Sequence, residues 1–166
     1  MTRKNALRFL KDNNVAVIST CYSKLPYSSA IHYVVDNRFN FYFVTTKNTD
    51  KYTNISENNN VSIVVGAGPK YVSISARGHA TKVHGGEKKK ILRQFTNLQK
   101  KHNTKIWPVR DLDSIQSNHG KPTKEIVYKI VPQHLVFLNI DDKTYKESLS
   151  ASRPHTIIPK NSDDKK

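Results

Sequence analysis

The stretch FYFVTTKNTDKYTNISENNNVSIVV, residues 41–65, decides the fold. Its two ends are apolar and typical of buried β-strands, and the segment between them is polar and rich in hydroxyl side chains. Thr49 or Asp50 can cap a short helix in that segment, and the run of asparagines after it ends the helix. The stretch therefore predicts a strand, a short helix and a second strand in close succession.

Lys51 falls in the first turn of this predicted helix, where the helix dipole favours anions over cations. A bound phosphate would explain the lysine, because the ammonium group and the backbone N–H groups of a helix N-terminus would both contact it. Thr45, Thr46 and Thr49 could add hydroxyl donors. The alternative is that Asp50 caps the helix and Lys51 is a solvated surface residue, and the residues alone leave both interpretations open.

The rest of the chain predicts a mainly β protein with flanking helices. We expect strands over residues 15–21, 27–35, 39–46, 61–65, 71–83, 125–131 and 135–140, the last two forming a hairpin, and further helices over residues 2–13 and 87–102. Tight turns between successive strands favour an antiparallel sheet, and this number of strands is enough to close a barrel. Gly78, in the middle of a long strand, indicates a bulge or a corner.

A single domain is expected over residues 1–141. Residues 103–123 are polar and irregular, which is typical of a functional or mobile loop. Residues 142–166 have no periodic apolar face, so we expect a basic, flexible C-terminal tail.

Composition bounds the class of protein but leaves the meaning of its charge open. No apolar run reaches the ~18 residues of a membrane helix, and the N-terminal segment reads as an amphipathic helix rather than a signal peptide. A single cysteine, Cys21, gives no disulfide framework, so a reducing cytoplasm is expected. The chain has 28 Lys and Arg against 13 Asp and Glu, formally +15, which suits a phosphate-bearing ligand, a nucleic acid or a merely solvated basic surface.

A nucleic-acid-binding β-domain is therefore one alternative. The segment RGHATKVH, residues 77–84, partly matches the strand pattern with which RNA-recognition domains bind bases. The stacking aromatic residues of that pattern are missing, and stacking provides much of the affinity in this kind of binding.

The sequence also resembles the pyridoxamine-phosphate-oxidase-like family of FMN-binding split barrels. The resemblance is strongest over residues 41–65 and includes residues 6–10, 15–20, 26–35, 72–83 and 127–132, so it covers most of the first 140 residues. It implies a six-stranded split β-barrel that forms a homodimer around two FMN sites. It also implies an FMN-dependent oxidoreductase that transfers electrons between a nicotinamide nucleotide, or a similar donor, and a small-molecule substrate.

By position, the resemblance assigns two groups of residues to the cofactor. The FMN phosphate would contact Thr45, Thr46 and Lys51, whereas the ribityl chain and the isoalloxazine edge would contact Ser28, Ser29 and Ala30. A flavin carries its own redox chemistry, so no catalytic acid or base is assigned, and no His or Cys spacing indicates a metal site.

The chain departs from the pyridoxamine phosphate oxidases proper. Those enzymes carry an arginine where this chain has Ser28 and Ser29, and they end in a segment bearing Arg and Trp that has no counterpart here. The vitamin reaction is therefore not expected. Related barrels bind haem or a deazaflavin, and a barrel without a cofactor would be a binding module, so these alternatives stay open.

Overall fold

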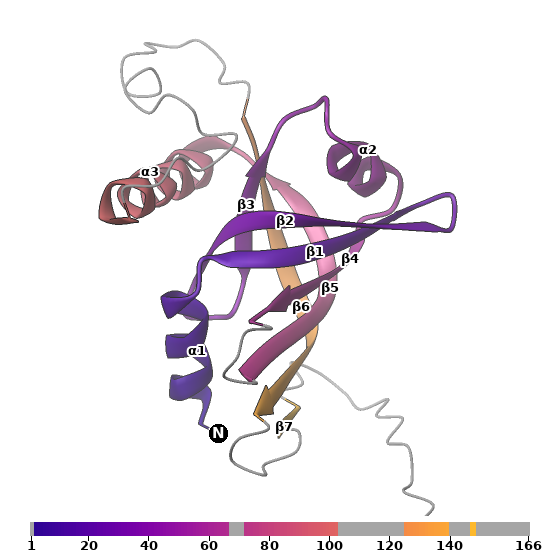
Figure 1. Ribbon diagram of the computed structural model, residues 1–166. Coiled ribbons are helices and arrows are strands. Elements are labelled where there is room, and N and C mark those ends of the chain that lie inside the picture. The colour runs from indigo at the N-terminus through magenta and orange to yellow at the C-terminus, as the bar shows by residue number, and fades with distance from the viewer. Residues whose placement is uncertain (1, 67–71, 103–124, 140–146, 149–166) are drawn as a thin grey trace, which may run out of the picture.

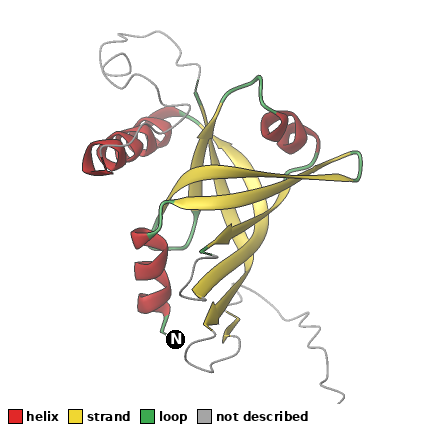
Figure 2. Cartoon of the chain, viewed as in Figure 1, coloured by secondary structure: helices red, strands yellow, loops and turns green. Residues whose placement is uncertain are grey.

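A computed structural model describes residues 2–66, 72–102, 125–139 and 147–148 of the chain (Figure 1). The elements in this part of the chain are α1 (Arg3–Asp12), β1 (Val15–Tyr22), β2 (Leu25–Val35), β3 (Phe41–Thr45), α2 (Asp50–Glu57), β4 (Asn60–Val65), β5 (Val72–Val83), α3 (Gly85–His102), β6 (Ile126–Asn139) and β7 (Glu147–Ser148). Figure 2 shows that the helices lie around a central body of strands. None of these helices is long and apolar enough to cross a membrane.

The strands form a closed antiparallel barrel. Their order is β3-β2-β1-β4-β5-β6-β7, and an additional pairing of β3 with β6 closes the first six strands into a ring (Figure 1). β7 lies outside this ring and, within the described residues, pairs with β6 alone, at Val136 and Phe137. The expected six-stranded barrel is therefore confirmed.

The barrel is split between β2 and β3. These two strands pair only from Tyr33 to Val35 on the side of β2, whereas β2 pairs with β1 from Leu25 to His32. Residues 25–32 thus have one edge that no described strand pairs with. The unpaired N–H and C=O groups of such an edge can hydrogen-bond a ligand or another chain.

Two apolar clusters hold the fold together. Alternate residues of the strands fill the barrel interior, with Ile18, Phe41, Phe43, Ile63, Ile74 and Ile130 among the most buried. A smaller cluster packs α3 against the outer face of β3 and β6 through Tyr42, Val44, Val127, Ile91, Leu92 and Phe95. β3 is therefore buried on both faces, and α3 covers only one side of the barrel.

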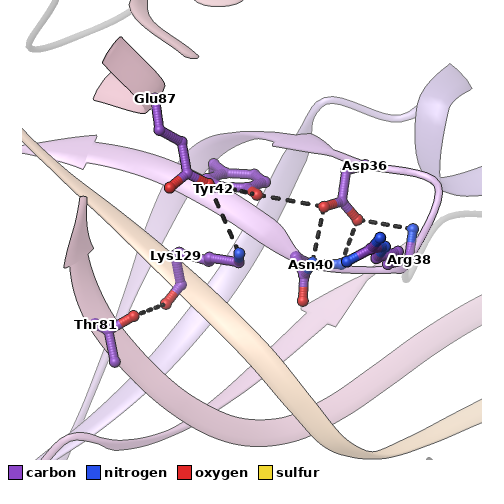
Figure 3. A network of polar contacts seen from close by, with 7 residues as sticks. All are labelled: Asp36, Arg38, Asn40, Tyr42, Thr81, Glu87 and Lys129. Carbon is purple, nitrogen blue, oxygen red and sulfur yellow. Dashed lines mark hydrogen bonds and ion pairs between the residues drawn. The ribbon is translucent and has the colours of Figure 1, made fainter. Parts of the chain in front are cut away.

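A polar network around Asp36 fixes the turn between β2 and β3 (Figure 3). Its carboxylate accepts hydrogen bonds from Arg38 N at 2.8 Å, from Asn40 N at 2.9 Å and from Asn40 Nδ2 at 2.7 Å. Burial alone would raise the pKa of Asp36, but these hydrogen bonds and one from Tyr42 lower the pKa below its ordinary value. The turn ends with Phe39 at a φ of 67°, so β3 begins at Phe41 rather than at residue 39 as expected.

The same network ties α3 to the barrel. The Tyr42 hydroxyl lies 3.3 Å from Asp36 Oδ2 and 3.1 Å from Glu87 Oε1, and it can donate its single proton to only one of them at a time. Lys129 Nζ lies 3.6 Å from Glu87 Oε1. Burial, and next the charge of Asp36, raise the pKa of Tyr42, which keeps the phenol protonated as a donor.

The expected hairpin over residues 125–140 is wrong, because β6 runs through it as one strand. Pro132 does not break β6, since it lies opposite Gly78 at a shift in the register of β5 and β6. β-Bulges tolerate a proline that a regular ladder would reject. The bulge indicated by Gly78 is confirmed, and a Cβ at that position would lie 2.1 Å from the Val131 carbonyl oxygen.

Two further expectations concern the segments near the C-terminus. The expected loop over residues 103–123 lies outside the described residues, as does most of the expected tail over residues 142–166. Within that tail, Glu147 and Ser148 form β7. A strand of two residues is too short to produce an alternating pattern in the sequence.

The close approach at the bulge gives the first prediction. Gly78→Ala should lower the free energy of unfolding by about 3 kcal/mol, because the new methyl group meets backbone atoms that cannot move aside. Urea unfolding followed by circular dichroism measures the loss. Gly86→Ala is the matched control, since nothing lies within 4 Å of a Cβ there. Equal stability of the two variants would contradict the prediction.

Candidate functional site

The start of α2 is held against the end of β3 by a chain of hydroxyl groups. Thr49 caps α2, its Oγ1 accepting from Tyr52 N at 3.3 Å, and the same hydroxyl donates to the Thr46 carbonyl at 3.0 Å. Because Thr49 has used its proton, Thr45 Oγ1 must be the donor in the 2.8 Å contact between the two side chains. Hydrogen bonds thus join the N-cap of α2 to the end of β3.

The candidate threonines differ in their surroundings. Thr45 is fully buried, and its hydroxyl donates a hydrogen bond to Thr49 Oγ1. Thr46 is half-buried, and its hydroxyl donates to the side-chain oxygen of Asn48. In this arrangement Thr45 positions the cap, whereas Thr46 lies nearer to solvent.

Lys51 is buried in the first turn of α2. Only 9% of its surface is exposed, so it is not the solvated lysine of the alternative interpretation. Burial lowers the pKa of its ammonium group, and the charge of Asp50 partly offsets this effect. A cation held at the positive end of a helix and withdrawn from water is suited to an anionic ligand.

The other candidate residues lie along the open edge of β2. Ser28 and Ala30 are exposed on the outer face, and Ser28 Oγ lies 2.9 Å from Ser19 Oγ. Ser29 alternates with them, and its Oγ is buried without a hydrogen-bond partner in the described part of the chain. A buried hydroxyl with no partner is costly and is one sign of a missing ligand or water.

α2 spans the opening between these two groups. Its first turn is bonded to the end of β3 through Thr45 and Thr49. Its last residue, Glu57, accepts from Ser23 N at 3.3 Å, at the tip of the β1–β2 hairpin. Figure 1 shows α2 beside this hairpin. The structure therefore places Ser28–Ala30 on one side of the split and Thr46 and Lys51 on the other.

Sequence patterns did not identify the residues that hold α2 against the barrel. Asn54 Nδ2 donates to Thr20 Oγ1 at 2.9 Å, and both side chains are buried. Lys82 Nζ lies 3.4 Å from the Tyr52 hydroxyl and 4.8 Å from the centre of its ring. No local pattern marks these pairs, because each joins residues at least 30 positions apart.

These residues fit the FMN phosphate and ribityl chain. The phosphate needs a cation and hydrogen-bond donors, which Lys51 and the first turn of α2 provide, and the Thr46 hydroxyl could add a donor in place of its contact with Asn48. The ribityl hydroxyls and the ring need hydrogen-bonding groups, which the unpartnered Ser29 Oγ and the open edge of β2 provide. The donor set holds no arrangement that favours a metal instead: the described residues contain no group of three His, Cys, Asp or Glu side chains.

Fold and site together define a split β-barrel with a cation at the start of its short helix. The family model described as pyridoxamine 5'-phosphate oxidase matches residues 2–130. The chain belongs to this family, as its sequence suggested. A comparison with curated protein sequences found no match.

Solved structures with the same fold carry different descriptions. General stress protein 26 from Bacillus anthracis is 19% identical with a TM-score of 0.66, over 89% of this chain and 97% of that one. A FAD-binding protein from Mesorhizobium loti is 17% identical with a TM-score of 0.53, over 81% and 92%. A heme binding protein from Mycobacterium smegmatis is 13% identical with a TM-score of 0.62, over 90% and 58%. At these identities the likeness shows the fold alone.

The burial of Lys51 predicts that this residue lowers the stability of the ligand-free protein. A lysine with a lowered pKa binds its proton less tightly in the folded than in the unfolded chain, so below the folded pKa the charge opposes folding. Lys51→Met should therefore raise the melting temperature at pH 7 by about 1–3 °C. The gain should shrink as the pH rises through the lowered pKa toward 10.5.

Differential scanning calorimetry of the ligand-free protein measures this effect. Lys47→Met is the matched control, because Lys47 is exposed four residues earlier and its replacement should leave the melting temperature unchanged. A lower melting temperature in Lys51→Met would show that the lysine stabilises the fold.

Proposed function

We propose that this protein is a cytoplasmic, homodimeric FMN-binding oxidoreductase. The observation that carries the proposal is the buried Lys51 in the first turn of α2, across the split from the open edge of β2. The phosphate of FMN is a dianion, and it would compensate the free-energy cost of withdrawing this ammonium group from water.

Each candidate residue has a distinct role in this proposal. Lys51 and Thr46 bind the phosphate, and Thr45 holds Thr49 so that the first turn of α2 faces it. Ser29 hydrogen-bonds the ribityl chain, and Ser28 and Ala30 lie along the ring edge. When bound, the flavin supplies the redox chemistry. The substrate is a small molecule, and the electron donor is a nicotinamide nucleotide or a molecule like it.

A FAD-binding and a heme-binding protein share this fold, which supports a cofactor in the barrel without selecting one. The phosphate-type site favours a flavin nucleotide over haem, because haem needs an axial ligand rather than a cation beside a helix N-terminus. Nucleic acid is disfavoured because β5, which carries most of the RNA-like segment, has no Phe, Tyr or Trp for stacking.

The proposed dimer rests on an exposed apolar surface of the barrel, which we call the valine face. It consists of Val15, Val17, Ala30 and Val64 on the outer side of β1, β2 and β4, with 49%, 46% and 37% of the three valines exposed. Val17 is the cross-strand neighbour of both Ala30 and Val64, so the surface is continuous. None of the outward residues of β1 and β4 is charged in a chain of +15, and two copies can therefore meet there without repulsion.

The phosphate site predicts a selective loss of FMN binding. Lys51→Met should raise the Kd for FMN about 10–100-fold, the usual cost of losing a charge-assisted hydrogen bond. The Kd for riboflavin should stay nearly the same, since riboflavin has no phosphate. Quenching of flavin fluorescence measures both constants, and Lys47→Met again serves as the control. Equal weakening of FMN and riboflavin would place the phosphate elsewhere.

The whole proposal is tested on the unmodified protein. A visible spectrum of the purified chain, before and after addition of FMN, distinguishes flavin from haem. A colourless protein that neither quenches FMN fluorescence nor gains thermal stability with FMN would overturn the flavin proposal.

The valine face predicts the oligomeric state. Val17→Lys should convert the dimer to a monomer, because a two-fold interface would bury the new charge twice. Light scattering coupled to gel filtration measures the mass. Asn97→Lys, on the exposed side of α3, is the control and should remain dimeric. A wild-type chain that is monomeric at micromolar concentration would contradict the assignment of this surface.

A further inference from the structure

A cleft lies between α1 and α3, which Figure 1 shows on the same side of the strands. α1 packs onto the barrel interior through Leu10, whereas α3 packs onto the outer face of β3 and β6 through Ile91 and Phe95. Because the two helices belong to different apolar clusters, the core side chains of neither helix fill the space between them. The cleft has a volume of about 450 Å³, which lies in the range of small-molecule sites.

The cleft has an apolar floor and a polar rim. The end of β2 crosses its base, and the floor consists of Leu10, Val34, Val35 and Leu98. On the side of α3, Lys90 and Gln94 precede Leu98 at intervals of four residues, so these three side chains form one stripe along the flank of the helix. On the side of α1 and the following turns, the rim consists of Lys11, Asn13, Asn14 and Asn37.

Two lysines and one carboxylate are the charged groups among the described residues that line the cleft. They are Lys11 of α1, Lys90 of α3 and Asp36 at the end of β2. The Asp36 carboxylate already accepts hydrogen bonds within its own turn. Lys11 Nζ donates to Asn37 Oδ1 at 2.8 Å, which uses one of its three protons. The cleft therefore has a net positive charge and N–H donors available to a ligand.

The end of α1 is compatible with an anion in this cleft. The C-terminus of a helix carries a partial negative charge on its last carbonyl groups. Here Asn13 Nδ2 donates to the Phe9 carbonyl at 2.8 Å, and the Tyr33 hydroxyl donates to the Leu10 carbonyl at 2.8 Å. These hydrogen bonds satisfy two of the carbonyl groups, and Lys11 in the last turn offsets the remaining partial charge.

We propose that the cleft between α1 and α3 binds a small organic anion. The charged group of this ligand contacts Lys11 and Lys90, and its apolar body lies on the floor of the cleft. A carboxylate, a sulfonate and a phosphate ester share this chemistry. The inference does not depend on the proposed function, because it uses none of the residues assigned to the flavin.

The cleft is remote from the candidate flavin site. Val35 lies six residues beyond Ser29 on β2, which corresponds to about 20 Å at a rise of roughly 3.3 Å per residue. Figure 1 shows α2, which carries Lys51, on the opposite side of the strands from α1 and α3. A ligand in the cleft and a flavin at the split would therefore not compete.

Anilinonaphthalene sulfonate (ANS) is a suitable probe of the cleft. It joins a fixed negative charge to an aromatic body, and its fluorescence rises when it leaves water. The full chain should bind ANS saturably, and ANS should raise the melting temperature, because a ligand that binds the folded state stabilises it. A protein that shows no saturable ANS binding would overturn the proposal.

The role of charge is tested on two neighbouring lysines. Lys90→Gln should raise the Kd for ANS about 10-fold, through the loss of a hydrogen bond to a charged group. Lys89→Gln is the matched control, because Lys89 is exposed one residue earlier and does not line the cleft. The Kd for phenylnaphthylamine, an uncharged analogue of ANS, should be the same in both variants. Equal affinity of the two variants for ANS would overturn the proposal.

The position of the probe is tested by filling the cleft. Gln94→Trp places an indole ring in the cleft from an exposed position of α3, so it should abolish ANS binding and leave the melting temperature of the ligand-free protein unchanged. Asn97→Trp, at an exposed position of α3 outside the cleft, is the control and should bind ANS normally. ANS binding that survives Gln94→Trp would place the probe on another surface, such as the valine face, and would overturn the proposal.

Saturation with FMN separates this inference from the proposed function. The Kd for ANS, measured by titration calorimetry, should be the same with and without FMN. Displacement of ANS by FMN would place the probe at the flavin site and overturn the inference. A protein that does not bind FMN would refute the proposed function, and the tests with Lys90→Gln and Gln94→Trp would still decide the inference.

Discussion

The double pairing of β3 is the constraint on which the rest of the structure depends. β3 has five residues, all of them buried, and it pairs with β2 on one side and with β6 on the other. Closing the barrel in this way leaves residues 25–32 of β2 with one edge that no described strand pairs with, and it leads the chain from Thr45 through a short turn into α2. The split, the position of the helix N-terminus and the burial of Lys51 all follow from one short strand.

The position of Lys51 costs folding free energy, and a bound anion would offset that cost. A lysine in the first turn of a helix opposes the dipole, and burial adds the loss of hydration. The hydroxyl chain from Thr45 through Thr49 holds the helix in place in spite of this cost. Residues that break a local rule while their neighbours reinforce it are typical of functional sites. Lys51 is such a residue, and Ser29, whose buried Oγ has no hydrogen-bond partner among the described residues, is another.

Sequence patterns predicted what depends on local chemistry and missed what depends on pairing. The caps of α2, the strand over residues 27–35 and the bulge indicated by Gly78 are short-range signals, and the structure agrees with each. Pro132 misled the prediction because a proline usually ends a strand, and only the glycine opposite it, more than 50 residues earlier, makes the bulge possible. The alignment of residues on the outer face likewise depends on the register of several strand pairs, as in the series Ser28, Ser19, Ser62, Arg77 and His134, and register is set by long-range packing that no local window contains.

The uneven distribution of charge connects the site with the proposed assembly. Most of the basic residues behind the formal net charge of +15 do not indicate a ligand. The lysines on the outer side of α3, for example, are solvated. Two cations differ from this background by their surroundings: Lys51 is buried, and Arg77 stands alone beside an uncharged apolar surface. Lys51 lies in the first turn of α2, and Arg77 lies on the outer face of β5. The outward residues of β1 and β4 carry no charge, so the charge of the chain lies away from the surface at which we propose that two copies meet.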